Sequence, residues 1–283
     1  MIFIPISDDN DEGYTRFRDH FINNGLLLLC IVVFAYEAFL SISQGSDSLH
    51  SFIHSNTFNP AFSLGTSFLS LSPMDRVMAL FRHLADIKNA DILNILKSTF
   101  IHGGLLHLLP NIFVLWMLGD NVEYAMGHVR YFFFFMLTAI LSQFGQLVFS
   151  TGDNFISQIG ASGAIMAVAG AYLVYFPRAR INFFYWFFLI YWGIKDISAR
   201  IVLLLYFILL LLIALAGDGT VDGTVVATWA HVFGFVAGAI LSLPLRYGRD
   251  DKYFQYTRAK SLSYNKSLFK TGDDDPDPWG KAL

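Results

Sequence analysis

Charged residues are scarce in this chain of 283 residues. Only 14% of its positions are Asp, Glu, Lys or Arg, whereas 55% are hydrophobic. A soluble domain carries roughly 25% charged residues, so this composition excludes an ordinary soluble protein. The net charge of −3 provides no basic surface for a polyanion, so we expect no nucleic-acid partner.

Cysteine is almost absent too. A single thiol, Cys30, excludes both an internal disulfide framework and a cysteine-based metal cluster. Basic residues are missing from the first part of the chain, where Asp8, Asp9, Asp11 and Glu12 precede the first arginine. Such an acidic start is typical neither of a secretory signal nor of a mitochondrial transit peptide, so we expect neither.

Long apolar runs dominate what is present. A bilayer-spanning helix needs about 20 mostly apolar residues. The runs that we interpret as spans cover residues 25–42, 100–120, 130–149, 161–177, 199–216 and 225–245. The aromatic stretch 181–194 is too short for a span, and we expect it to form a hairpin or segment at the membrane interface. The sequence therefore predicts an all-α polytopic membrane protein.

Lys and Arg concentrate on one side of these predicted spans. Fifteen of the 19 lie in segments that are cytoplasmic if the N-terminus is cytoplasmic, and the other four lie in the long loop 43–99. Because these residues accumulate on the cytoplasmic side, we expect both termini inside and the loop outside. The predicted organisation is a cytoplasmic segment 1–24, a transmembrane core 25–246 and a cytoplasmic, partly disordered tail 247–283.

Few polar side chains interrupt the predicted spans, and each is a functional hypothesis because its burial in lipid is costly. They are Glu37, His102, His107, Asn111, Gln143, Gln146, Ser162 and His231. At 1.5 Å per residue from the inner surface, Ser162 and His231 both lie about 6–8 Å below the outer surface, with His107 at a similar height. We expect the glutamate and the two glutamines to serve structure only.

Small residues surround the serine and the last histidine of this set. They are Gly163, Ala167 and Gly170 on one face of the fourth span, and Gly234 and Gly238 on the histidine's face of the sixth. Faces of small residues let two membrane helices approach closely. We therefore expect the fourth and sixth spans to pack backbone to backbone, which brings Ser162 within reach of His231.

That approach is what a nucleophilic serine requires. A serine hydroxyl becomes a nucleophile when a base takes its proton, and imidazole can do so near neutral pH. Unpaired N–H groups at the start of the fourth span, with His107 and Asn111 on one face of the second, could stabilise an oxyanion. His102 lies off that face, and we expect it to serve structure.

Three motifs in the chain resemble those of rhomboid intramembrane serine proteases. The stretch HGGLLHLLPN at 102–111 resembles their second helix, GASGA at 160–164 their nucleophile motif and AHVFGF at 230–235 their histidine motif. The match is most similar to prokaryotic members, and it implies a six-transmembrane-helix rhomboid-like bundle. Because the sequence shows no transit peptide, we expect a prokaryotic plasma (inner) membrane. It also implies hydrolysis of peptide bonds in or near transmembrane segments of membrane-protein substrates.

The resemblance further implies a role for each residue. Ser162 would be the nucleophile and His231 the general base and acid, with His107, Asn111 and the Ser162 backbone N–H as the oxyanion hole. The residues implied as structural support are Gly160, Gly163, His102, Gly234 and Gly238. The fifth helix and the loop 217–224 would act as gate and cap. Neither a cofactor nor a metal is implied.

Two departures from the family pattern stand out. Met166 occupies a position where some members have a tyrosine under the histidine, and Pro110 lies inside the second span, where it should bend the helix. A catalytically silent relative that binds or escorts membrane proteins is the alternative to a protease, although inactive relatives usually lack the serine or the histidine. A transporter or metal site on His102, His107 and His231 is a weaker hypothesis, because no carboxylate lies among them.

Overall fold

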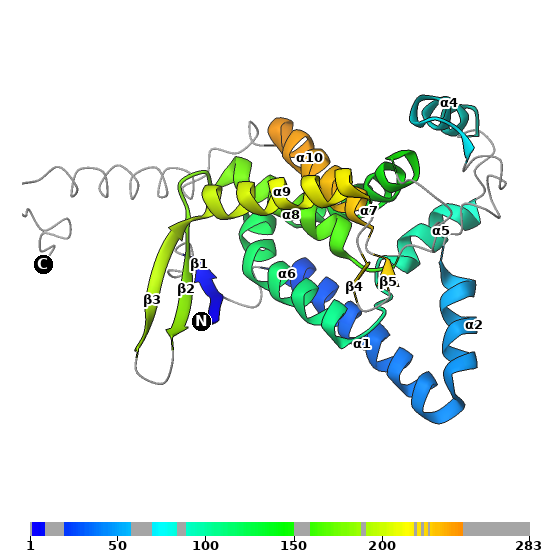
Figure 1. Ribbon diagram of the computed structural model, residues 1–283, viewed down its shortest axis with the longest axis horizontal. Helices are drawn as coiled ribbons and strands as arrows, with labels where there is room; N and C mark the ends of the chain where they lie inside the picture. The colour runs from blue at the N-terminus through cyan, green and yellow to red at the C-terminus, as the bar shows by residue number, and fades with distance from the viewer. Residues whose placement is uncertain are drawn as a thin grey trace, which may run out of the picture. The chain divides into compact units, whose positions relative to one another are not determined.

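The computed structural model describes residues 2–8, 20–57, 70–83, 89–149, 159–187, 191–217, 220–221, 224–225 and 227–245. All of them belong to one compact unit, Met1–Gly248. The predicted tail 247–283 lies outside the described residues. Those residues form mainly helices, together with a three-stranded and a two-stranded antiparallel sheet (Figure 1).

The bounds of these elements follow. The helices are α1 (Phe21–Gln44), α2 (Ser46–Asn56), α4 (Pro73–His83), α5 (Asn89–Ser98), α6 (Leu105–Met126), α7 (His128–Phe149), α8 (Ser162–Tyr175), α9 (Ala199–Ala216) and α10 (Thr228–Leu245). The strands are β1 (Ile2–Asp8), β2 (Arg180–Phe187), β3 (Tyr191–Ser198), β4 (Thr220–Val221) and β5 (Thr224–Val225).

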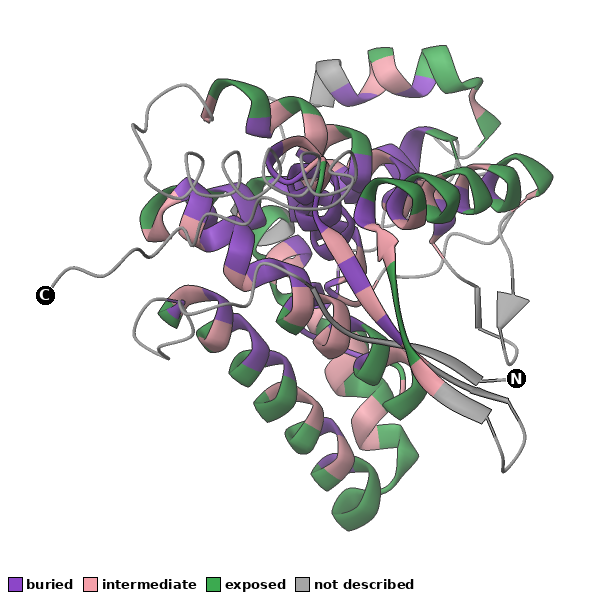
Figure 2. Cartoon of the chain, turned by 90° about the vertical axis from the view of Figure 1, so that its left-hand side faces the viewer, coloured by how far each residue is buried: buried purple, intermediate pink, exposed green. Residues whose placement is uncertain are grey.

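Five helices, α1, α6, α7, α9 and α10, are long and apolar enough to cross a bilayer. The predicted fourth span, 161–177, is shorter than expected, because α8 has only 14 residues. It contacts α6, α7, α9 and α10, and most of its residues are buried. Figure 2 shows the buried residues gathered on the central helices. Because other helices surround α8 on several sides, its length does not have to match the bilayer, and it can be shorter than the lipid-facing helices.

The predicted interfacial segment 181–194 is a β-hairpin. Strands β2 and β3 pair antiparallel from Arg180–Ser198 to Phe187–Tyr191, and the backbone N–H of Ala199 closes the base with a 2.8 Å bond to the Ala179 carbonyl. A third strand was not expected: β1 pairs with β2, so the sheet order is β1-β2-β3. The predicted all-α membrane bundle is confirmed, and this small sheet is an addition to it.

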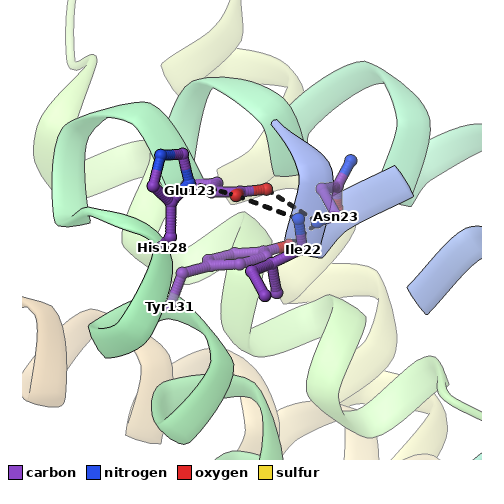
Figure 3. Close-up of polar contacts among 5 residues, drawn as sticks. All are labelled: Ile22, Asn23, Glu123, His128 and Tyr131. Carbon is purple, nitrogen blue, oxygen red and sulfur yellow. Dashed lines mark hydrogen bonds and ion pairs between the residues drawn. The ribbon is translucent and has the colours of Figure 1, made fainter. Parts of the chain in front are cut away.

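A buried glutamate joins the start of α1 to the end of α6 and the start of α7 (Figure 3). The Glu123 carboxylate accepts hydrogen bonds from the backbone N–H groups of Ile22, at 3.1 Å, and Asn23, at 2.6 Å. It also lies 2.6 Å from His128 Nδ1, and the Tyr131 hydroxyl donates to Asn23 Oδ1. The first N–H groups of a helix have no partner within it, so a carboxylate placed there accepts their hydrogen bonds. Its negative charge also interacts favourably with the positive end of the helix dipole.

The predicted loop 43–99 contains helices α2, α4 and α5. Arg76 of α4 is 5% exposed, and its guanidinium donates to the carbonyls of Leu147 and Val148, in the last turn of α7, at 3.4 Å. Burial lowers the pKa of Arg76, but an arginine side chain stays charged in proteins. A cation at the C-terminal end of a helix is stabilising, so Arg76 attaches α4 to the bundle.

Candidate active site

Ser162 and His231 are brought together by the first turns of two packed helices. Ser162 is the first residue of α8, and His231 lies in the first turn of α10. The Ser162 Oγ and His231 Nε2 atoms are 2.7 Å apart. This is a hydrogen-bond distance, so the predicted contact between the two side chains is present.

Glycine packing explains how α8 and α10, separated by more than 50 residues of chain, can meet so closely. A Cβ atom on Gly234 would collide with the carbonyl oxygen of Gly163, and one on Gly238 with the carbonyl oxygen of Ala167. Backbone therefore touches backbone along this face, as the small-residue pattern predicted.

Only one side of the His231 ring has a partner. Nε2 faces Ser162, while Nδ1 is buried and has no hydrogen-bond partner among the residues that the structure describes. With its proton on Nδ1, the neutral ring presents the Nε2 lone pair to the serine hydroxyl. The geometry therefore suits proton transfer from Ser162 to His231 without an orienting carboxylate in the described part of the chain.

The position of α10 depends on Gln146, which we expected to be purely structural. The Gln146 side-chain oxygen accepts the backbone N–H of Ala230 at 3.0 Å. Ala230 directly precedes His231, and its N–H, in the first turn of α10, is shared with the Ala227 carbonyl at 3.1 Å. The hydropathy pattern could not indicate this role, because the partner is a backbone group in a distant helix.

His107 reaches the loop that carries Ser162. A Cβ atom on Gly160 would lie only 2.6 Å from two atoms of the His107 ring, so the ring lies directly against that glycine. Gly160 has φ +104°, a conformation that side-chain-bearing residues rarely adopt. Its N–H donates to the Ser98 carbonyl at 2.9 Å. The His107 ring thus lies beside the segment that leads into Ser162.

Asn111 is buried but turned toward its own helix. Its side-chain Nδ2 donates to the His107 carbonyl at 3.0 Å. The structure therefore places Asn111 one turn below His107 without aiming its amide at Ser162. Pro110 lies inside α6, which continues through it.

His102 has the structural environment that we expected. It is 2% exposed, its Nδ1 lies 3.1 Å from the Phe100 carbonyl, and its ring meets the His107 ring edge to face, with centroids 5.2 Å apart. Its backbone N–H donates to the Glu37 carboxylate. We did not expect Glu37 to contribute to this site. The indication in the sequence was the presence of a carboxylate within an apolar span.

No metal site accompanies these histidines in the described ranges. Among those residues, no three His, Cys, Asp or Glu side chains gather in a way that could hold a metal ion. The Ser162–His231 pair is an arrangement with recognisable reaction chemistry, since a serine hydroxyl beside an imidazole base can act as a nucleophile.

The part of the chain that holds Ser162 and His231 is similar to known proteins. Residues 89–248 match the sequence profile of the Rhomboid domain family. The chain is also 29% identical over 146 residues to Rhomboid protease GlpG of Yersinia pestis (strain Pestoides F), covering 52% of this chain and 45% of that protein. It is 28% identical over 162 residues to RHOMBOID-like protein 4 of Arabidopsis thaliana, covering 56% and 35% respectively.

A shorter match involves mitochondrial proteins. The human Presenilin-associated rhomboid-like protein, mitochondrial, is 32% identical over 88 residues, which is 30% of this chain and 23% of that protein. The chain thus spans about a quarter of the length of that relative and less than half of the other two.

Proposed function

The chain belongs to the rhomboid family, which its match over 89–248 shows, and we propose that it is an intramembrane serine endopeptidase. The observation that carries the proposal is the 2.7 Å distance between Ser162 Oγ and His231 Nε2. The family includes a relative named a protease, Rhomboid protease GlpG. The proposed substrates are membrane proteins cleaved in or near a transmembrane segment.

The proposed reaction begins with proton transfer within the pair. His231 Nε2 takes the hydroxyl proton of Ser162 as Oγ attacks the carbonyl carbon of the scissile bond. As the resulting tetrahedral intermediate collapses, the carbon–nitrogen bond breaks and His231 gives that proton to the leaving amine. Water, deprotonated by His231, then hydrolyses the ester on Ser162 and restores the serine.

The oxyanion of this intermediate needs hydrogen-bond donors. Ser162 begins α8, so its backbone N–H and those just after it lack helical partners and form one source of donors. We propose the His107 ring as a second donor, because it lies against Gly160. Asn111 would be a third, after its amide turns away from the His107 carbonyl.

Substrate access is proposed along α9. This helix buries only Ala199, Leu203, Leu210 and Ala214, so it is held less extensively than α8, which it contacts. A helix with few buried residues can move at lower cost. We propose that α9 acts as a lateral gate and that the loop 217–224, of which residues 218–219 and 222–223 lie outside the described residues, acts as a cap over the site.

The membrane is proposed to be the plasma (inner) membrane of a prokaryote. The protein is a multi-pass membrane protein by its helices. The support for this location is that the three motifs resemble those of prokaryotic members and that a bacterial relative matches 52% of this chain. The Arabidopsis thaliana and human mitochondrial relatives match 56% and 30% of it. Fractionation of the source cells, with the protein detected in the plasma-membrane fraction, tests this location.

The central test is labelling by a serine-reactive fluorophosphonate, together with cleavage of a model transmembrane substrate in liposomes. We expect Ser162→Ala to abolish both and His231→Ala to abolish cleavage, since removing a nucleophile or its base costs on the order of 10⁶-fold. Ser242→Ala is the matched control, because its buried hydroxyl only donates to the Ala239 carbonyl of its own helix.

Two results would contradict the proposal. Labelling or cleavage that survives Ser162→Ala would remove this serine from the reaction. A folded wild-type protein that neither labels nor cleaves would favour the alternative, a catalytically silent rhomboid-like protein that binds or escorts membrane proteins.

A further inference from the structure

We infer that Glu37 is a positioning residue of the active site, acting from α1 through His102 on the His107 ring. This inference rests on the proposed function, since it assigns another part to the same site. Glu37 touches neither Ser162 nor His231 in the described contacts, so its effect must pass through the residues between them.

The first step is the burial of the Glu37 carboxylate. Glu37 is 3% exposed in a helix whose other side chains include Val32 and Phe39, each more than half exposed. A buried carboxylate in a membrane-spanning helix is costly unless hydrogen bonds compensate it. Here both carboxylate oxygens lie within reach of the His102 backbone nitrogen, at 3.1 and 3.3 Å.

The second step is where that N–H group lies. His102 belongs to the non-helical segment between the end of α5 at Ser98 and the start of α6 at Leu105. A backbone group there has no helical ladder to fix it. The Glu37 carboxylate therefore sets the position of this segment relative to α1.

The third step connects this segment to His107. The His102 ring is itself held, because Nδ1 lies 3.1 Å from the Phe100 carbonyl. Its ring and that of His107 meet at an interplanar angle of 63°, with centroids 5.2 Å apart. A ring locked by a hydrogen bond limits the orientations that its neighbour can adopt. Fixing His102 therefore restricts the ring that we propose as an oxyanion donor.

The last step reaches the nucleophile. The His107 ring lies against Gly160, two residues before Ser162. Contacts thus connect Glu37, His102, His107 and Gly160 in sequence. A shift of the segment before α6 would move the His107 ring relative to the Ser162 Oγ.

The test compares two substitutions at Glu37 in liposomes with a model transmembrane substrate. Glu37→Gln keeps an acceptor oxygen for the His102 N–H, so we expect kcat within about threefold of wild type. Glu37→Leu removes the acceptor, and we expect kcat to fall about tenfold or more with KM little changed, the size expected for losing a hydrogen bond to a charged group.

The same Glu37 substitution in a His107→Ala protein distinguishes a positioning role of Glu37 from general destabilisation. Because Glu37 acts through His107, we expect Glu37→Leu to cause little further loss of kcat in a His107→Ala protein. A merely structural effect would lower activity by the same factor in both backgrounds. Leu40→Ala, which removes a buried side chain from the same helix, is the control that lowers stability and keeps the Glu37 carboxylate.

The outcomes are distinct. Equal losses with Glu37→Leu in both backgrounds, or a Glu37→Gln protein as impaired as Glu37→Leu, would overturn the inference while leaving the serine mechanism intact. Should Glu37→Leu not fold, Glu37→Ala replaces it in the same comparison. Failure of the proposed function appears elsewhere, as labelling that survives Ser162→Ala.

Discussion

Asn111 poses the sharpest question at the scale of single residues. Its amide donates to the His107 carbonyl at 3.0 Å, within its own helix. A role in the oxyanion hole then requires the side chain to turn when charge develops on the substrate. Such a donor contributes to the transition state and not to substrate binding.

We therefore predict that Asn111→Ala lowers kcat by about 10²–10³-fold while KM stays near its wild-type value, the usual effect of one oxyanion donor. Steady-state cleavage in liposomes measures both constants. Asn121→Ala, at the other end of α6, is the comparison variant and should leave kcat nearly unchanged. An Asn111→Ala protein with normal kcat would show that its amide stays on the helix backbone throughout the reaction.

At the scale of elements, the α8–α10 interface determines whether the site exists. Gly238 has no room for a side chain, because a Cβ atom would collide with the carbonyl oxygen and Cα of Ala167. Neither backbone can yield without separating the helices that carry Ser162 and His231. The interface is thus intolerant of even one methyl group.

Gly238→Ala is accordingly expected to destabilise the folded protein by about 1–3 kcal/mol, the range for overpacked cores, and to reduce fluorophosphonate labelling. Thermal unfolding in detergent measures the stability. Gly25→Ala, in α1, is the matched control, since nothing lies within 4 Å of its Cβ position. Alanine stabilises a helix by about 1 kcal/mol relative to glycine. The Gly25→Ala protein should therefore be at least as stable as wild type. Equal behaviour of the two variants would contradict the close packing.

The sequence predicted this interface better than it predicted the supports around it. Small residues at helical spacing are visible in one stretch of chain, so the approach of Ser162 to His231 could be inferred. Gln146 and Glu37 could not be interpreted in this way. Each binds a backbone N–H group in a distant segment, and the sequence does not say which N–H groups the fold leaves unpaired.

The helix boundaries were also predicted only in part from the sequence. The predicted second span began at residue 100, but α6 begins at Leu105, after Gly103 and Gly104. Hydropathy registers apolar residues whether or not their backbone is helical. Strand β1 escaped prediction because its pairing partner, β2, lies more than 170 residues further along the chain.

For the whole molecule, the distribution of Lys and Arg predicts which side of the membrane each connection occupies. His50, in α2, and Lys195, in β3, are both exposed and belong to connections expected on opposite sides. The native Cys30 is 1% exposed and should react slowly. Single cysteines can therefore report the orientation with little background.

We predict that a membrane-impermeant maleimide labels His50→Cys in intact cells and labels Lys195→Cys only after the cells are opened. The unsubstituted protein is the control for Cys30. Labelling of both variants in intact cells, or of Lys195→Cys alone, would contradict cytoplasmic termini and an external loop 43–99.

The pairing of β1 with β2 also constrains the order in which the protein is made. During synthesis, β1 leaves the ribosome before its partner β2, which follows only after α1, α6, α7 and α8. Contacts between such distant segments form slowly, because a long loop must close. The sheet therefore forms late relative to α1, and protease resistance of β1 would mark the moment at which the part of the bundle through α8 and the β2–β3 hairpin has been made.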